Sequence, residues 1–345
     1  MTSPRPSEEW LEPGVFEVVK DVFRIPLPLP NDALRAVNVY LLRGKSSLVC
    51  IDSGWSLPES RERLVRCLAS LECGPEDIER FLVTHVHRDH YTQAIALRQE
   101  HHTKVSLGAG ERPALEELGR PGFSGLARRA DGLRRNGAGV LADRLLSERA
   151  VQPRPVASDW EMPDDWLTGG DAVQAADSTL DVIETPGHTR GHVVFHDAGQ
   201  RLLYAGDHVL PRITPSIGFE VVPSPDPLGD FLGSLARVRQ LPDAMLLPAH
   251  GPVVPSAHDR IDELVDHHGR RLDKSLQALN AGADTAYEVA LQLRWTRREL
   301  SFDDLDIFNQ SLAVSETAAH LVLLEAQGRA RSSLEDGINR FAALS

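Results

Sequence analysis

The chain has 345 residues, enough for one large domain and a smaller one at about 100 to 200 residues per domain. Hydrophobic residues make up 41% and charged residues 25%, an ordinary globular composition, and no apolar run reaches the roughly 18 residues that a bilayer crossing needs. A formal net charge of -13 repels phosphate backbones and disfavours, without excluding, a nucleic-acid partner.

The first 14 residues, MTSPRPSEEWLEPG, show neither the apolar run of a secretory signal nor the Arg-rich pattern of a transit peptide. A cytoplasmic location is therefore expected. The three cysteines, Cys50, Cys67 and Cys73, match neither a disulfide framework nor a zinc pair. Reduced thiols agree with that location.

Residues 15–52 predict short strands, because β-branched and apolar runs alternate with turn residues in VFEVVKDVFRIPL, AVNVYLLRG and SLVCIDSG. Residues 57–71 have helical periodicity, and IERFLVTH is typical of a buried strand. A second strand series follows residue 170, in LDVIETPGH, HVVFHD, RLLYAGDH and AMLLPAHG. A polar motif follows the end of several of these strands, which is where α/β sheets place their ligand sites.

Between the two strand series, residues 111 to about 160 predict a helical insertion rich in Gly, Arg and Leu. Residues 120–149 hold seven arginines against three acidic residues, a local net charge of +4. These arginines can be solvated helix faces, or they can form a lid that attracts an anionic substrate. They are Arg120, Arg128, Arg129, Arg134, Arg135, Arg144 and Arg149.

Residues 256–345 predict a mainly helical C-terminal domain, because apolar residues recur at helical spacing in RIDELVDHHGRRLDKSLQALN, TAYEVALQLRW and VSETAAHLVLLEAQGRA. From residue 258 onward, ten Lys and Arg stand against fifteen Asp and Glu, a net charge of -5 that does not suit a DNA reader. We interpret this part as a packing or dimerisation domain whose apolar faces allow a homodimer.

Residues 81–94, FLVTHVHRDHYTQA, place three histidines and an aspartate within six positions directly after an apolar run. Imidazole nitrogen and carboxylate oxygen are the ligands of catalytic zinc sites, although a single buried histidine is more often structural. Three later motifs, ETPGHTRGH, YAGDH and LLPAHG, each follow an apolar strand. The candidate ligands of the four motifs are His85, His87, Asp89, His90, His188, Asp207 and His250.

In order and spacing, these motifs resemble the signature of the metallo-β-lactamase superfamily over roughly residues 15–255, and the tail resembles the winged-helix-like extension of one branch. The resemblance implies an α/β fold, an αββα sandwich with a helical insertion, and two divalent metal ions. Zinc is the first expectation, with iron or manganese as alternatives. The same resemblance implies the ligands of each metal: His85, His87 and His188 for the first, Asp89, His90 and His250 for the second, and Asp207 as the bridge.

The resemblance also implies a mechanism in which a hydroxide that bridges the metals attacks the substrate, with Asp89 as a catalytic residue that orients it or accepts its proton. Asp52 in IDSG matches an early aspartate of the family that orients a ligand histidine, or else it only closes its strand. The sequence departs from the pattern at YTQA, residues 91–94, where many members have small residues. We expect these side chains at the metal rim. His192 and His208 can be proton donors or substrate contacts, but we expect them in supporting rather than catalytic roles.

The segment ETPGHTRGHVVF is similar to that of hydroxyacylglutathione hydrolases, and no cysteine stands among the candidate ligands, as in the glyoxalase II-like and lactonase-like branches. A small, anionic acyl thioester, or a related ester or lactone, is therefore the expected substrate, since a thiolate with a thiol pKa of about 8.5 leaves without a strong general acid. Two alternatives stay open: a phosphodiesterase or endoribonuclease of the same superfamily, and a non-catalytic metal-binding protein.

Overall fold

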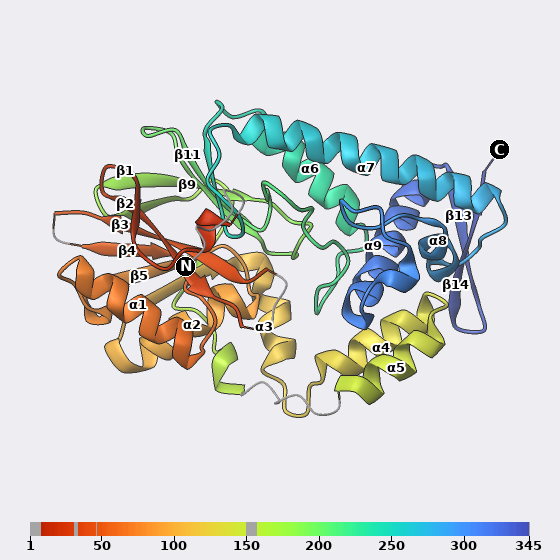
Figure 1. Ribbon diagram of the computed structural model, residues 1–345, viewed down its shortest axis with the longest axis horizontal. Coiled ribbons are helices and arrows are strands. Elements are labelled where there is room, and N and C mark those ends of the chain that lie inside the picture. Colours follow the sequence, from red (N-terminus) through yellow and green to blue (C-terminus); the bar gives the residue numbers. More distant parts are fainter. Residues whose placement is uncertain (1–7, 31–33, 46, 150–156, 345) are drawn as a thin grey trace.

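Two β-sheets packed face to face form the centre of the protein, whose computed structural model describes residues 8–30, 34–45, 47–149 and 157–344 (Figure 1). The first sheet has seven strands in chain order: β1 (Phe16–Val19), β2 (Val22–Pro28), β3 (Ala36–Arg43), β4 (Leu48–Ile51), β5 (Ile78–Val83), β6 (Lys104–Gly108) and β7 (Asp165–Leu167). The second sheet runs in the order β12 (Met245–Pro248), β11 (Leu202–Gly206), β10 (Val193–Asp197), β9 (Ser178–Glu184) and β8 (Ala172–Ala175).

Strand directions bring several strand ends to one edge of this sandwich. Strands β4, β5, β6 and β7 pair in parallel, so they end at the same edge of the first sheet. In the second sheet β11 is parallel to β12, and β9 points the same way because both β9 and β11 are antiparallel to β10. Loops that follow β5, β9, β11 and β12 therefore begin close together.

The interface between the sheets is apolar and buries whole strands. Strand β3 is buried along seven of its eight residues, as expected for a strand covered on both faces. Tyr40 from β3 and Tyr204 from β11 meet edge to face with ring centroids 5.6 Å apart, and the Tyr40 hydroxyl donates to the carbonyl oxygen of Pro248 at 2.8 Å. These contacts lock the first sheet onto the end of β12.

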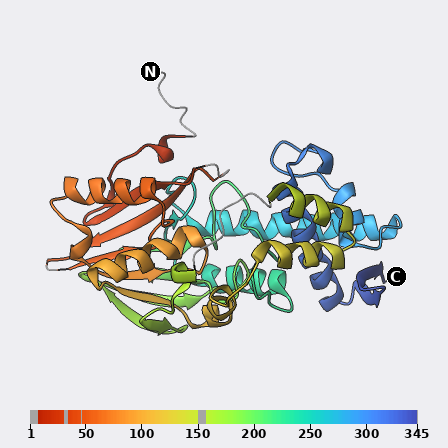
Figure 2. The same ribbon diagram turned by 90° about the horizontal axis from the view of Figure 1, so that it is seen from below.

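Helices cover both outer faces and complete the expected αββα sandwich, which is confirmed (Figures 1 and 2). On the first sheet lie α1 (Pro58–Ser70), α2 (Arg88–His101) and α3 (Arg112–Leu118), whose buried leucines and alanines share one core with that sheet. On the second sheet lie α6 (Pro227–Arg239) and the start of α7 (Ala257–Asn280).

The C-terminal region is helical, with α7, α8 (Ala286–Gln292) and α9 (Ile307–Ala326), followed by a hairpin of β13 (Ala330–Glu335) and β14 (Ile338–Ala343). The insertion begins with α3 on the first sheet and continues with α4 (Gly125–Arg135) and α5 (Gly139–Arg149), which pack against α9 (Figure 2). Helices α4 and α5 and the C-terminal helices thus share one hydrophobic core. The domain division at residue 255 stays a prediction, and residues 150–156 of the insertion lie outside the described residues.

Three local features differ from the sequence-based expectations. The first predicted strand is two strands, because the chain turns at Asp21, whose φ of 64° is in the left-handed region. Strands β6, β7 and β8 have no counterpart among the predicted strands, and they are short. Helix α9 starts at Ile307, seven residues before the predicted segment, because the Asp306 side chain caps it by accepting from the Asn309 amide.

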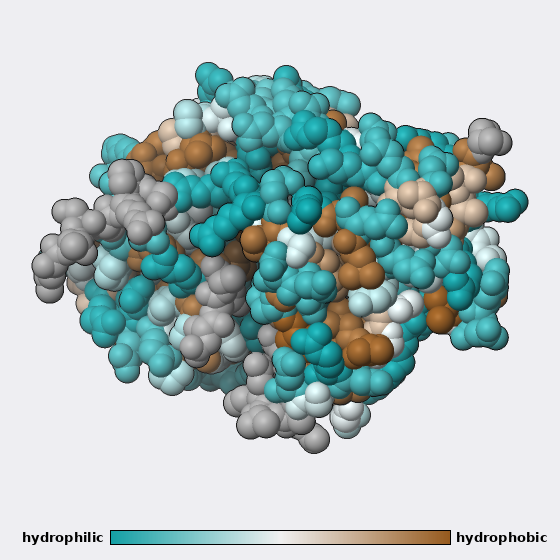
Figure 3. Space-filling model, turned by 45° about the vertical axis from the view of Figure 1, so that its right-hand side comes forward, coloured by the Kyte–Doolittle hydropathy of each residue, from teal (hydrophilic) through white to brown (hydrophobic). Residues whose placement is uncertain are grey.

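The surface is mainly hydrophilic, with hydrophobic side chains gathered near the middle of the face in Figure 3. Among the described residues, no helix combines the length and the hydrophobicity that a bilayer crossing requires.

Candidate metal centre

The histidine-rich segment forms the turn between β5 and α2. His85 and His87 lie in the loop after β5, and His87 is the N-cap residue of α2, with extended backbone angles. Asp89 and His90 therefore belong to the first helical turn and point in another direction than the two loop histidines. His188, Asp207 and His250 come from the loops after β9, β11 and β12. The structure thus brings all seven candidate ligands to the same edge of the sandwich.

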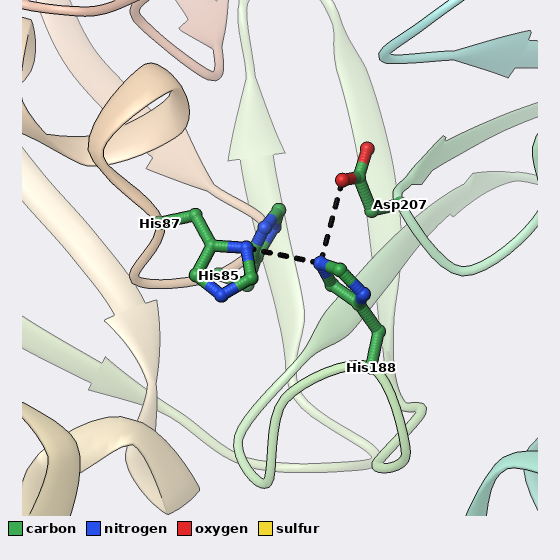
Figure 4. Close-up of side chains that lie close together, drawn as sticks. All are labelled: His85, His87, His188 and Asp207. Atoms are coloured by element: carbon green, nitrogen blue, oxygen red, sulfur yellow. Dashed lines mark hydrogen bonds and ion pairs between the residues drawn. The ribbon is translucent and has the colours of Figure 1, made fainter. Parts of the chain in front are cut away.

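The seven side chains form two clusters, in each of which one ligand-capable atom per residue lies within 4.8 Å of the others. In the first cluster, His188 Nε2 lies 3.0 Å from His87 Nδ1 and 3.4 Å from Asp207 Oδ2 (Figure 4). Ligand atoms on a tetrahedral zinc ion with bonds of about 2.0 Å lie about 3.3 Å apart. The observed separations match that spacing. The first cluster comprises His85, His87, His188 and Asp207.

The second cluster has the same spacing. His250 Nε2 lies 3.4 Å from Asp89 Oδ2, and His90 Nε2 lies 3.6 Å from the same oxygen. The other carboxylate oxygen of Asp207, Oδ1, lies 3.4 Å from His250 Nε2. Asp207 therefore directs one oxygen toward each cluster, which is the placement expected of a bridging ligand.

Hydrogen bonds orient the ring nitrogens of the ligand candidates. In three of the five histidines, Nδ1 faces an acceptor: Ser216 O at 2.9 Å from His188, Ala36 O at 2.7 Å from His250, and a carboxylate oxygen of Asp52 at 2.9 Å from His90. A proton on Nδ1 leaves the Nε2 lone pair of a neutral ring directed into the cluster.

Four buried polar atoms in these clusters have no hydrogen-bond partner among the described residues: His85 Nε2, His90 Nε2, Asp207 Oδ1 and His250 Nε2. Buried polar groups are normally satisfied, and unsatisfied ones require an explanation such as an ion. A divalent cation in each cluster satisfies these atoms with the nitrogen and oxygen donors that such ions accept. The residues present therefore fit a dinuclear metal centre.

The two clusters differ in electrostatics. Burial lowers the pKa of His85, lowers that of His87 to about 3 and lowers that of His188 to about 4, so the first cluster is held in the unprotonated, ligating form. Burial alone would also lower the pKa of His90, but three carboxylates outweigh it and raise that pKa to about 10. These belong to Asp52, Asp89 and Asp207.

Asp52 shows how the first sheet supports the second cluster. Its carboxylate is 2% exposed, accepts from the Thr84 amide at 2.8 Å and the Thr84 hydroxyl at 3.0 Å, and faces His90 Nδ1. Its φ of 58° is a left-handed conformation that aspartate tolerates. The side chain therefore orients a candidate ligand as well as closing its strand.

The three side chains expected at the metal rim are not there. Tyr91, Thr92 and Gln93 are between 0% and 2% exposed. Thr92 accepts from the Ser56 amide at 2.9 Å, and Gln93 donates to the Ser53 carbonyl at 2.7 Å. Thr92 and Gln93 fasten α2 to the loop after β4, and the Tyr91 hydroxyl donates to the Glu161 carbonyl at 2.5 Å, so the expectation that these side chains lie at the metal rim is wrong. The motif continues into a helix rather than an extended loop, and that helix turns these side chains away from the metal centre.

The other two histidines are also buried. His192 Nε2 accepts from the Asp207 amide at 3.1 Å, and its ring stacks on His85 with centroids 5.0 Å apart. The His208 ring meets Phe231 edge to face at 5.3 Å, away from the clusters. His192 therefore supports the two ligands beside it, and neither histidine faces outward to meet a substrate.

A loop between β11 and α6 connects the metal centre to the C-terminal helices. Its Ser216 carbonyl accepts from His188, and a Cβ on Gly218 would lie 2.9 Å from the Ser315 carbonyl of α9. The next residue, Phe219, meets Phe308 of α9 edge to face with ring centroids 5.7 Å apart. We call residues 216–219 the bridging loop. No motif in the sequence indicated it.

The arginines of the insertion are largely occupied by neighbouring acids. Arg134 pairs with Asp131 at 3.1 Å and Asp143 at 2.8 Å. Arg129 is different, because its guanidinium stacks on Phe219 of the bridging loop, 3.8 Å from the ring centroid. Arg129 therefore contacts the bridging loop through Phe219, and the side chain of Arg149 lies outside the described residues.

A third group of ligand-capable side chains, His267, His268 and Glu316, lies between α7 and α9. The Arg271 guanidinium interacts electrostatically with Glu316 and with both histidines. A divalent cation there would be repelled by this charge. We therefore regard the group as a buried polar contact between the two helices.

Comparison with known proteins agrees with this geometry. The family model described as "Metallo-beta-lactamase superfamily" matches residues 32–250. A probable metallo-hydrolase of Bacillus subtilis (strain 168), YqjP, is 27% identical over 329 residues, which are 89% of this chain and 93% of that protein.

Two solved structures are similar over nearly the whole chain. A metallo-beta-lactamase family protein from Thermus thermophilus is 25% identical with a TM-score of 0.77, covering 94% of this chain and 99% of that one. A beta-lactamase domain protein from Burkholderia ambifaria is 27% identical with a TM-score of 0.76, covering 96% and 93%. Both similarities extend through the insertion and the C-terminal helices.

Proposed function

Because the chain belongs to the metallo-beta-lactamase superfamily, we propose that it is a metal-dependent hydrolase of an acyl thioester or a related ester or lactone. The observation that carries the proposal is Asp207, whose two oxygens face two clusters of buried histidine and aspartate side chains. A relative described as a probable metallo-hydrolase, aligned over most of both chains, supports the reaction class.

The metal ligands of the proposed enzyme are His85, His87 and His188 in the first cluster, Asp89, His90 and His250 in the second, and Asp207 between them. When bound, two divalent ions would polarise the scissile carbonyl and lower the pKa of a water molecule to about 7. Zinc is the first candidate, and iron or manganese also suit nitrogen and oxygen donors.

Asp89 is the proposed catalytic residue. Its side chain is 15% exposed, more than that of Asp207 at 9%, so it lies toward the open side of the centre. Burial would raise the pKa of Asp89, but His90 and His250 outweigh it and hold the pKa well below its usual range. An ionised carboxylate in this place can orient the attacking water by accepting its hydrogen bond.

The environment of the clusters favours a leaving group that needs no strong acid. His192 and His208 are buried, and burial lowers the pKa of His208 to about 3 and that of His192 well below its usual value, so neither supplies a proton near neutral pH. A thiolate, whose conjugate acid has a pKa of about 8.5, departs without one. Neither metal cluster contains a cysteine among the described residues, which supports the glyoxalase II-like or lactonase-like branch.

An anionic group on the substrate agrees with the arginines of the insertion, because Arg129 reaches the bridging loop beside the metal centre. Helices α7, α8 and α9 followed by the β13–β14 hairpin support a winged-helix-like C-terminal extension, whose net charge of -5 from residue 258 onward opposes a nucleic-acid role. Three cysteines without a disulfide support a reducing, cytoplasmic location. A homodimer remains part of the proposal.

The test is a substrate panel of acyl thioesters, lactones, a phosphodiester and a β-lactam, assayed with metal-replete protein and with Asp207→Ala as the control. We expect hydrolysis of a thioester, ester or lactone that the variant lacks. Turnover of the phosphodiester alone, falling steeply with ionic strength, would establish the nuclease alternative instead. A chain that binds metal but hydrolyses no compound of the panel would contradict the proposal.

A further inference from the structure

Glu111 connects the two loops that carry the first metal cluster. It follows β6, its side chain is fully buried, and its Oε1 accepts from the Val86 amide at 3.3 Å and from the Thr189 hydroxyl. Val86 stands between His85 and His87, and Thr189 directly follows His188. One carboxyl oxygen thus bonds to a neighbour of each histidine in this cluster.

We propose that Glu111 is a positioning residue that holds these two loops at the separation that the first cation requires. The inference rests on the proposed metal centre and adds to it a residue that touches neither ion nor substrate. Supporting residues around metal ligands commonly change metal affinity by about 10- to 100-fold when they are removed. Glu111 differs from a partner of a single ligand because it acts on the relative position of two loops.

Glycines bring the backbone of residues 108–111 directly against the His188 loop. A Cβ on Gly108 would lie 2.1 Å from the Gly191 carbonyl oxygen, and one on Gly110 would lie 2.8 Å from the Gly191 Cα. A Cβ on Gly191 would lie 2.0 Å from the Glu111 amide nitrogen. Only residues without side chains allow this approach, and it is what places the Glu111 carboxyl within reach of Thr189.

Burying the Glu111 carboxyl group is energetically unfavourable, which argues against a purely structural role for it. Its second oxygen, Oε2, is buried without a hydrogen-bond partner among the described residues. Burial raises the pKa of Glu111 to about 8, and the nearby Glu220 contributes to the increase, so the group is mostly protonated and neutral at pH 7. Glutamine keeps the accepting Oε1 and the neutral charge, whereas alanine removes the connection.

The experiment compares Glu111→Ala and Glu111→Gln with wild type and with Asp197→Ala, which removes another buried carboxylate from the far end of β10. Metal content after dialysis against a limiting chelator, competition titrations of both ions, and the absorption bands of cobalt-substituted protein are measured. We expect Glu111→Ala to lose about 10- to 100-fold in affinity for one of two ions, and Glu111→Gln to stay within about threefold of wild type. Asp197→Ala should keep both affinities.

The inference would be overturned if Glu111→Ala bound both ions with wild-type affinity, or if Glu111→Gln lost as much metal affinity as Glu111→Ala. If Glu111→Ala does not fold, Thr189→Val removes only the hydroxyl that donates to Glu111, with Thr317→Val of α9 as the buried-threonine control. An unchanged metal affinity in Thr189→Val would then be the contrary result. Wild-type protein that binds two ions but hydrolyses nothing in the panel refutes the proposed function alone, and wild type that binds no ion refutes both.

Discussion

Asp52→Asn should selectively weaken the second metal cluster. In wild type, Asp52 Oδ1 accepts from the Thr84 amide at 2.8 Å while Oδ2 faces His90 Nδ1 at 2.9 Å. If the asparagine oxygen keeps the Thr84 contact, its NH₂ group meets the Nδ1 proton of His90. The two N–H groups repel each other until His90 moves its proton from Nδ1 to Nε2, and this move removes the Nε2 lone pair that a metal needs.

The loss of such a supporting contact corresponds to about 10- to 100-fold in metal affinity, or about 1.4 to 2.7 kcal/mol. The first cluster should keep its affinity, because among the described residues Asp52 bonds to His90 and reaches His85 only through the Thr84 hydroxyl. Metal content and competition titrations measure the two sites separately, and kcat/KM for the active compound of the panel should fall with the second ion.

Asp197→Asn is the matched control, since Asp197 is 3% exposed and accepts from the Gln200 amide at 2.8 Å far from the clusters. It should change neither affinity. Two ions bound to Asp52→Asn at wild-type strength would refute the reasoning about the His90 proton. An equal loss at both clusters would show instead that Asp52 only supports the fold.

Three further predictions follow from charge and burial. Lowering the pH from about 9 to about 6 should release the second-cluster ion first. Protons compete with this ion for His90, whose pKa is raised to about 10, and for His250, whose pKa is also raised, while His87 and His188, with pKa values of about 3 and 4, stay unprotonated. His250→Ala protein retains the first cluster and should show no such pH dependence, so a comparable loss of metal from this variant would contradict the prediction. Arg129→Ala should raise KM for an anionic thioester by up to about 5-fold, the equivalent of an exposed ion pair of about 1 kcal/mol, and by more than Arg134→Ala/Arg135→Ala does, because Arg129 stacks on the bridging loop. An unchanged KM in both variants would remove the anion argument. A thiol reagent should modify Cys73 alone in folded protein and all three cysteines after unfolding, because Cys50 and Cys67 are buried and burial raises the pKa of both thiols. Two rapidly modified thiols in the native state would contradict the burial of Cys50 and Cys67.

Local patterns in the sequence predict most of the strands and the positions of the candidate ligands, whereas the αββα arrangement was implied by the resemblance to a known family and is confirmed. Buried strands such as β5 are apolar runs in the sequence, and the polar motifs come directly after them, so strand direction together with the packing of the two sheets brings His85, Asp207 and His250 to one edge. The resemblance to a known family supplied the assignment of ligands to two ions. Whether each of these residues binds metal stays a prediction.

What the sequence could not provide depends on contacts between distant segments. Tyr91 and Gln93 look like site residues because they follow the motif, yet the helical turn at Asp89 directs them into the core. Glu111 is 25 residues from Val86 and 78 from Thr189, and no periodicity connects them. The glycines at positions 108, 110 and 191 were the available signal, because close backbone approach is one reason for glycine near a strand end.

The bridging loop makes metal loading and the packing of the C-terminal helices a single linked equilibrium. The first cation needs the His188 ring that Ser216 orients, and the loop keeps its shape by resting on Ser315 and Phe308 of α9. An ion that binds only when this loop is ordered would stabilise the packing of α9. By thermodynamic reciprocity, a ligand of α9 whose affinity the ion changes would change the affinity for the ion by the same factor. A change in the packing of α9 should therefore change the retention of the first cation, although that helix lies far beyond His188 in the chain.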